Sequence, residues 1–270
     1  MTVLAAVAGR IVPRGLGSRR AFLLIERNAH VYRRTWLVLV SGFFEPLFYL
    51  LGVGFGIGGL VGAVPGPDGR LIPYGAFVAP ALLAASAMNG AIYEATLNVF
   101  FRLKYERIYE AILATPVGPG DIALGEIGWA LIRGLLYALG FMVVMVALGL
   151  VASPLALLAI PAAVVVGFGF AGAAMAATTW MRSWQDFDLV QLVVLPLFLF
   201  SGTFFPLTAY PPVLAAIVQV TPLYRSVDLV RSFTTGVVGP SVVLDVVYLL
   251  GMGFLGLTIV SRRLDKLLLK

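Results

Sequence analysis

The sequence contains no cysteine and a single histidine, His30. Without cysteine there is no disulfide, no thiolate nucleophile and no thiolate metal site. None of the three lysines is preceded by glycine and followed by serine or threonine, so the chain lacks the Walker A loop that binds ATP. It has no G-x-S-x-G motif, and His30 lies in a basic segment where a polar role at the lipid headgroups is expected. We therefore expect no catalysis, no bound cofactor and no metal in this chain.

Charge is scarce as well. Charged residues make up 12% of the sequence, against about 25% in soluble domains. Apolar and aromatic residues make up 60%, and the mean hydropathy is +0.99. This composition predicts an all-α polytopic membrane protein, because helices satisfy their own backbone hydrogen bonds in lipid. The preference for Ala, Val and Gly, and for Arg over Lys, indicates a bacterial gene rich in G and C.

Six apolar segments are long enough to cross a bilayer, or nearly so. Each is bounded by proline, glycine or charged residues, which mark turns and membrane surfaces. We expect transmembrane helices at about 36–57, 74–98, 122–150, 155–180, 188–205 and 242–260. Together they form one transmembrane domain, residues 35–261.

Three other segments have distinct characters. Residues 1–34 precede the first span, and within them 18–34 alternate arginines with apolar residues, which predicts an amphipathic helix on the membrane surface. Residues 207–240 hold apolar pieces too short to cross, which predicts re-entrant helices between spans five and six. Residues 262–270 form a basic tail.

The basic residues are distributed unevenly about the predicted spans. Fifteen lysines and arginines lie on the side of the two termini, and three, Arg70, Arg225 and Arg231, lie on the opposite side. Because positively charged loops stay in the cytoplasm, this bias predicts that both termini are cytoplasmic.

A polar island separates the second and third spans, at residues 101–121. We expect an amphipathic helix at about 102–116, stopped by Thr115-Pro116, with Arg102 and Glu106 paired on its flank. Its apolar stripe comprises Tyr105, Ile108 and Ile112. A solvated connection and a docking helix for a soluble partner are both compatible with this pattern.

Polar side chains within the spans are candidates for a substrate pathway, because burying them in lipid is costly. Glu45 is expected about 14 Å deep in the first span, just before Pro46, whose missing N–H predicts a kink. A polar face on the second span lines either a cavity or a helix contact, and the aromatic residues near Glu45 suit an amphipathic molecule. The candidate pathway residues are Glu45, Phe48, Tyr49, Ser86, Asn89 and Tyr93.

Other charged residues in the spans have less definite roles. Glu94 and Asn98 are expected to reach the cytoplasmic surface by snorkelling. Glu126, Arg133 and Asp245 are able to form ion pairs, but the sequence does not identify the partners.

Three stretches match G-x-G-x-x-G, at residues 54–59, 167–172 and 251–256. None of them follows a strand, which dinucleotide binding requires. We expect these glycines to allow close packing of membrane helices.

Three further stretches carry a family resemblance. Residues 44–56 read FEPLFYLLGVGFG, residues 102–116 read RLKYERIYEAILATP, and residues 201–207 read SGTFFPL, followed by Pro211, Pro222 and Arg231. These stretches resemble the permease subunit of ABC-2 type exporters, particularly the lipooligosaccharide (nodulation-factor) and drug-resistance branch. The resemblance covers about residues 20–262.

The resemblance implies that two six-helix permeases pair and that a separate ATPase docks on each coupling helix, so that ATP and Mg bind to the partner. It implies a role in coupling for Arg102, Tyr105, Glu106, Arg107, Ile108, Tyr109 and Glu110. It implies a role in the outer gate for Ser201, Gly202, Phe204, Phe205, Pro206, Pro211, Pro222 and Arg231.

On this interpretation the chain exports a glycolipid, a lipooligosaccharide or a hydrophobic drug across a bacterial inner membrane. It does not distinguish a homodimer from a heterodimer, or alternating access from lateral entry. The alternative is a membrane scaffold that recruits a soluble protein through residues 102–116 without transport.

Overall fold

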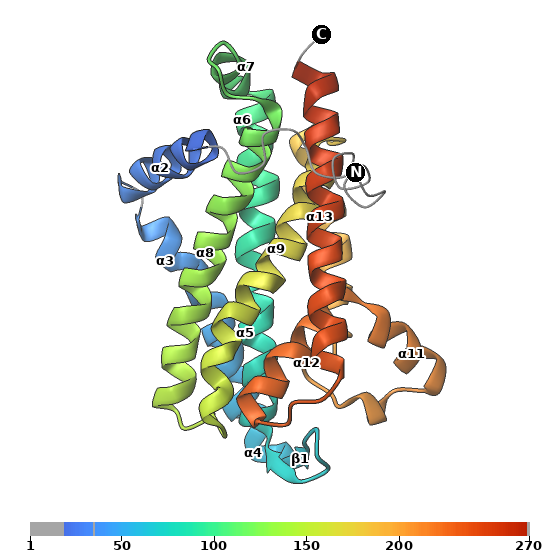
Figure 1. Ribbon diagram of the computed structural model, residues 1–270. Coiled ribbons are helices and arrows are strands. Elements are labelled where there is room, and N and C mark those ends of the chain that lie inside the picture. The colour runs from blue at the N-terminus through green and yellow to red at the C-terminus, as the bar shows by residue number, and fades with distance from the viewer. Residues whose placement is uncertain (1–18, 35, 269–270) are drawn as a thin grey trace, which may run out of the picture.

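The computed structural model describes residues 19–34 and 36–268. The first 18 residues of the predicted N-terminal segment and the last two of the tail lie outside this range. The described chain is almost entirely helical, and its long helices run side by side (Figure 1). We call the two ends of the bundle the α7 end, where α2, α7 and the end of α13 lie, and the β1 end, where α4 and the strands lie (Figure 1).

The helices and strands follow one another in this order: α2 (Arg19–Arg34), α3 (Trp36–Tyr49), the π-helix η1 (Leu50–Ile57), α4 (Gly58–Val61), β1 (Ala63–Pro65), β2 (Leu71–Pro73), α5 (Tyr74–Tyr93), the π-helix η2 (Glu94–Asn98), α6 (Val99–Lys104), α7 (Ile108–Leu113), α8 (Pro119–Ala147), η3 (Pro154–Leu158), α9 (Ala159–Thr178), η4 (Trp184–Asp186), α10 (Phe187–Leu199), η5 (Leu207–Ala209), α11 (Pro212–Val220), α12 (Pro222–Thr235) and α13 (Ser241–Leu268).

The prediction of an all-α polytopic membrane protein is confirmed. Within the described residues, five helical segments are long and apolar enough to cross a membrane: Phe44–Val61, Tyr74–Lys104, Pro119–Ala147, Pro154–Thr178 and Ser241–Leu268. These five correspond to predicted spans one to four and six. The segment containing α5 is the central one, buried between α8, α9 and α12.

The fifth predicted span, 188–205, is helical only as far as Leu199. Pro196 lies near the end of α10, and the chain then bends through Gly202, whose φ of +69° suits glycine. The 13 residues of α10 extend about 20 Å, which is less than the roughly 30 Å of a bilayer core. α11 and α12 follow with an 81° bend between them and lie at the β1 end (Figure 1). Their geometry suits either a broken span or the predicted re-entrant segment.

The connection between the first two spans contains a feature that the sequence analysis did not predict. β1 and β2 pair as an antiparallel hairpin, with Val64 opposite Ile72. The turn includes Gly69 at a φ of +77°, a conformation that glycine adopts without strain. The hairpin therefore holds this loop in an ordered position at the β1 end.

Closely packed glycines join α9 to α13. A Cβ added at Gly172 would lie 2.6 Å from the carbonyl oxygen of Gly253, and one at Gly256 would lie 2.2 Å from the carbonyl carbon of Gly172. The predicted close-packing role is thus confirmed for these glycines. In the first G-x-G-x-x-G stretch it is wrong for Gly59, which has no neighbour within 4 Å of an added Cβ among the described residues.

Replacing Gly256 with leucine should lower the free energy of unfolding by about 1–3 kcal/mol, because the backbones of α9 and α13 must separate to make room for the side chain. Gly251 on the same helix provides the control, since an added Cβ there meets nothing within 4 Å in the described structure. Unfolding of the purified protein in a detergent titration measures both variants. Equal stability of Gly256→Leu and Gly251→Leu would contradict the close packing.

Candidate functional site

Five charged side chains meet inside the bundle near the α7 end. Arg102 forms ion pairs with Glu94 at 3.1 Å and with Glu126, while Arg133 lies 3.0 Å from Glu94. Arg27 of α2 approaches Glu126 to 3.1 Å. Both glutamate side chains are fully buried. We call these five residues the charge network; it connects α2, η2, α6 and α8.

Neutral polar groups complete the hydrogen bonding of the two glutamates. Tyr32 and Asn98 each donate a 2.7 Å hydrogen bond to Glu94, and Asn28 donates one of 2.9 Å to Glu126. Burial, followed by the charge of Glu94, raises the pKa of Tyr32 above its usual value, so its hydroxyl remains a donor. The network is therefore well supplied with donors, as buried carboxylates require.

The charge network corrects two expectations from the sequence and answers one open question. Glu94 does not snorkel, because it is fully buried among arginines, and Asn98 binds it. Arg102 does not pair with Glu106, because α6 ends at Lys104 and Arg102 points inward to the glutamates. The sequence left open the partners of Glu126 and Arg133. Glu126 pairs with Arg102 and Arg27, and Arg133 pairs with Glu94.

The predicted helix at 102–116 is interrupted. α6 ends at Lys104 and α7 begins at Ile108, with Arg107 between them in the left-handed conformation at a φ of +51°. This conformation is strained for a residue other than glycine. The break turns Tyr109 inward, where it is fully buried, so the expected apolar stripe through Tyr105 is wrong.

A groove of about 430 Å³ lies between α2 and α7. Of the predicted coupling residues, Glu106, Arg107 and Ile108 line it, and Tyr105 and Glu110 are exposed nearby. Arg20 of α2 donates a hydrogen bond to the carbonyl of Pro116. The groove lining consists of Arg20, Leu23, Leu24, Arg27, Glu106, Arg107, Ile108, Ala111, Ile112, Thr115 and Val117. It is accordingly apolar at its base and carries more arginines than glutamates.

Arg27 connects the groove to the charge network, and the buried Tyr109 of α7 lies close to Glu126 of the network. Arg27 lines the groove and also pairs with Glu126. Burial, followed by the charge of Glu126, raises the pKa of Tyr109 well above its usual value. α2 is therefore in direct contact with the charge network through Arg27.

The candidate pathway residues are divided between three environments. Glu45, Tyr49, Asn89 and Tyr93 line one small cavity of about 80 Å³, together with residues of α10. Phe48 lines an adjoining hollow with Glu45 and Tyr49. Ser86 is buried in a helix contact instead. The polar face of span two thus lines a cavity at two positions and a helix contact at a third.

The candidate outer-gate residues form part of a connected structure at the β1 end. Arg231 of α12 donates hydrogen bonds to the carbonyls of Gly202 and Phe77, at 2.8 and 3.1 Å. Its guanidinium also lies 4.1 Å from the Phe77 ring centroid. Ser201 bonds to Thr203 at 2.7 Å, and the carbonyl of Phe204 accepts a hydrogen bond from Tyr74.

The remaining outer-gate candidates lie around this structure. Pro222 begins α12, Pro206 precedes η5, and Pro211 precedes α11. Phe205 is exposed. Arg231, which the sequence places on the side opposite the termini, is buried against α5.

Replacing Arg231 with methionine should destabilise the protein by about 1–3 kcal/mol, because the buried carbonyl of Gly202 loses its donor. Hydrogen exchange should also accelerate in residues 201–205. Arg70→Met is the control, since the side chain of Arg70 is exposed in the hairpin turn. Unchanged exchange in the Arg231 variant would show that this arginine does not hold the loop.

Comparison with known proteins places these features in context. A family model described as ABC-2 type transporter matches residues 19–234. Nodulation protein J of Sinorhizobium fredii is 32% identical over 245 residues, covering 88% of this chain and 92% of that protein. Nodulation protein J of Rhizobium leguminosarum bv. trifolii is 35% identical over 222 residues, covering 82% and 83%. The inner membrane transport permease YadH of Escherichia coli is 28% identical over 221 residues, covering 79% and 80%.

Proposed function

Since this chain belongs to the ABC-2 type transporter family and is a membrane-spanning subunit of such a transporter, we propose that it is the permease of an exporter driven by a separate ATPase. The ATPase binds ATP and Mg, and the permease itself performs no chemistry. The observation that carries this proposal is the groove between α2 and α7 and its connection to the charge network.

The groove suits the ATPase as a docking site. It combines an apolar base with a rim that includes Arg20, Arg27 and Arg107, which favours a partner surface with apolar and acidic side chains. ATP-driven movement of that partner shifts α7, and Tyr109 and Arg27 transmit the shift to the buried glutamates. In this assignment Glu106, Arg107 and Ile108 contact the ATPase, while Arg102 and Tyr109 act inside the subunit.

The substrate is an amphipathic molecule, such as a glycolipid, a lipooligosaccharide or a hydrophobic drug. Support comes from the cavity in which Glu45 and Asn89 lie beside Tyr49 and Tyr93, since this lining offers both polar and aromatic contacts. Expulsion of drugs and the resulting antibiotic resistance are included in this proposal.

The working exporter contains two permeases and two ATPase subunits. α10 has no buried residue within the described structure, and Phe48 and Tyr49 near it are exposed, so apolar surface remains available to a second permease. The membrane is the bacterial inner membrane. The α7 end faces the cytoplasm, because basic residues lie at the ends of α2, α6 and α13 there, and the charge bias of the sequence assigns both termini to the same side.

The test is to isolate the chain from native membranes and identify the proteins that accompany it by mass spectrometry. We expect an ATPase with a Walker A loop, lost when Ala111→Trp fills the groove and retained in Ala147→Trp, an exposed position at the end of α8. Recovery of a partner without ATPase activity would favour the scaffold. Recovery of the ATPase with both variants would remove docking from the groove.

A further inference from the structure

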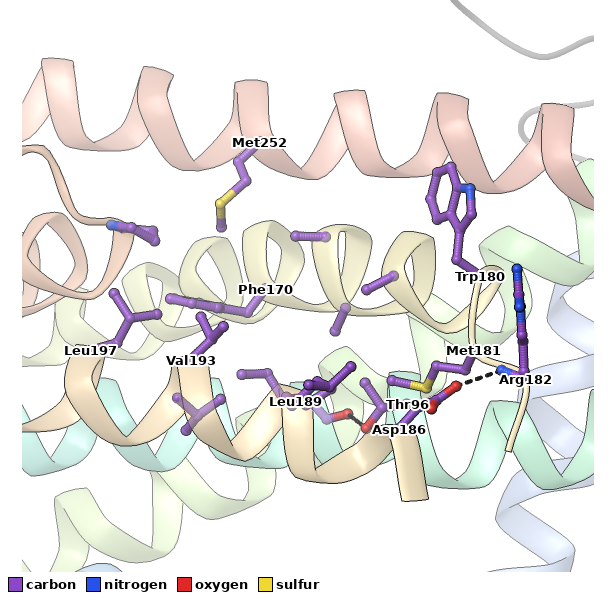
Figure 2. Close-up of a pocket in the computed structure, with 17 residues that line it drawn as sticks. Thr96, Phe170, Trp180, Met181, Arg182, Asp186, Leu189, Val193, Leu197 and Met252 are labelled. Atoms are coloured by element: carbon purple, nitrogen blue, oxygen red, sulfur yellow. Dashed lines mark hydrogen bonds between the residues drawn. The ribbon is translucent and has the colours of Figure 1, made fainter. Parts of the chain in front are cut away.

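A large pocket of about 620 Å³ lies apart from the charge network and the groove, and it shares the lining residues Ile92 and Val194 with the Glu45 cavity. It is lined mainly by α9 and α10, and Figure 2 shows side chains from these two helices and Met252 of α13 around it. Its volume is within the roughly 300–1,000 Å³ that ligand sites occupy. None of the side chains described above as coupling or pathway residues lines this pocket.

The sequence explains why the space is open. The wall on α9 includes Ala173, Ala174 and Ala177, whose methyl groups cannot reach α10. The opposite wall carries larger apolar residues such as Leu189 and Val193. Water does not stabilise a space of this size with apolar walls. The pocket therefore suits an apolar molecule that fills it.

The two ends of the pocket differ in chemistry. Leu197 lies at one end, while Arg182 and Trp180 lie at the other (Figure 2). Trp180 and Trp184 are both exposed, and exposed tryptophans of membrane proteins favour the level of the lipid headgroups. The pocket therefore opens at headgroup level and extends into the hydrocarbon core.

Positive charge predominates at the mouth. The guanidinium of Arg182 has no hydrogen bond or ion pair among the described residues, whereas that of Arg263 lies 4.6 Å from the Trp180 ring centroid and donates a 3.2 Å hydrogen bond to the carbonyl of Thr179. The carboxylate of Asp186 accepts the backbone N–H groups of Arg182 and Ser183, at 2.7 and 3.3 Å (Figure 2). These hydrogen bonds hold the pKa of Asp186 below its usual range and engage its oxygens within the turn. The charged residues that line the pocket are thus Arg182 and Asp186, and Arg263 adjoins the pocket beside Trp180.

The part of the pocket that runs along α9 is about as long as one membrane leaflet is deep, and Pro222 at the start of α12 lines the pocket beyond it. Phe170 and Trp180, which both line it, are ten positions apart in the sequence, which corresponds to about 15 Å of helix. This is half of the roughly 30 Å hydrocarbon thickness. A soluble ligand has no reason to match that depth, whereas an acyl chain that enters from the headgroup level does.

We propose that this pocket binds one acyl chain of an anionic membrane phospholipid, with the phosphate group held at the mouth by Arg182 and Arg263. The lipid fills the space between α9 and α10 and is distinct from the exported substrate. Anionic lipids are abundant on the cytoplasmic side of membranes, where the mouth lies in the proposed orientation. Only that orientation depends on the proposed function; the pocket itself does not.

The test uses the full chain without an ATPase, reconstituted with phosphatidylglycerol that carries a photoactivatable diazirine at the end of one acyl chain. We expect adducts on residues near Phe170 and Leu197, at least tenfold above those on the exposed apolar surface of α8. Ala177→Phe should reduce the adducts at least tenfold by filling the pocket. Val143→Phe, at an exposed position of α8, should leave them unchanged.

The headgroup preference is measured with the same label on phosphatidylcholine. Arg182→Gln should remove the preference for phosphatidylglycerol while phosphatidylcholine adducts stay constant. Ala174→Leu is a second filling variant, and both filling variants are compared at equal helix content. Pocket adducts no more frequent than those on α8, adducts that persist in both filling variants, or equal labelling by the two lipids in the unmodified chain would each overturn the proposal.

Discussion

Replacing Glu94 with glutamine is expected to lower the free energy of unfolding by about 3–5 kcal/mol, as does breaking other buried ion pairs. Glu94 is fully buried and accepts contacts from both Arg102 and Arg133, so its neutralisation leaves Arg133 without a carboxylate in the interior. The measurement is unfolding of the purified protein in a detergent titration. Glu106→Gln is the matched control, because this substitution removes the same charge from an exposed side chain.

A double-variant cycle separates the ion pair from the cost of an unpaired charge. Arg133→Gln alone should also destabilise the protein, but combined with Glu94→Gln the loss should be smaller than the sum by about 0.5–3 kcal/mol. Additive losses, or a Glu94→Gln variant as stable as Glu106→Gln, would show that the charge network does not hold the α7 end together.

Replacing Arg107 with glutamate is expected to weaken binding of the ATPase at least tenfold and to abolish substrate-stimulated ATP hydrolysis. Arg107 lies in the groove beside Arg20 and Arg27. Reversal of its charge places an acidic group opposite the acidic side chains expected on the ATPase surface, so the two repel. Copurification and the hydrolysis rate of the reconstituted complex measure the two effects. Arg70→Glu is the control, since it makes the same substitution in the hairpin turn at the β1 end.

The conformation of Arg107 adds a second variant. Its positive φ favours glycine, so Arg107→Gly should retain or increase stability while it removes the charge. If binding falls in both Arg107 variants and stability falls in neither, the groove contact is the cause. Equal loss of binding in Arg70→Glu would exclude the groove as the specific docking site.

The apolar runs, and the proline, glycine and charged residues that bound them, sufficed to predict the class of the protein and five of its membrane-crossing segments. Four of these segments have 25 to 31 residues, more than the roughly 20 that a bilayer requires, so errors of several residues at their ends do not matter; the first has 18. α10 is the exception, because Pro196 and Gly202 shorten it within a run that remains apolar. Hydropathy reports which residues tolerate lipid, and it does not report where the helix ends.

The contacts of the charge network could not be predicted from the sequence, for a different reason. Glu94 and Arg133 are 39 positions apart, and which faces of α5 and α8 meet depends on the rotation of both helices. Composition does not fix that rotation. The glycine pairs of α9 and α13 were easier to predict, because small residues indicate a close contact wherever the contact lies.

The break between α6 and α7 at residues 105–107 was not predicted, because it depends on the backbone conformation of a single residue. Tyr105, Ile108 and Ile112 have helical spacing, yet a left-handed residue at Arg107 breaks the period. Arginine rarely adopts that conformation, so nothing in its identity indicated the break. The inward turn of Tyr109 follows from it.

The backbones of α9 and α13 are in direct contact, which restricts the movement of the two helices relative to each other. With no side chain between Gly172 and Gly256, neither helix slides or rotates past the other without a steric clash. α10 is attached differently, through Phe187 against Phe100 at one end and Phe198 against Tyr49 and Phe204 at the other. We therefore expect the α9–α13 pair to move as one unit and α10, held mainly by aromatic contacts at its two ends, to shift relative to it.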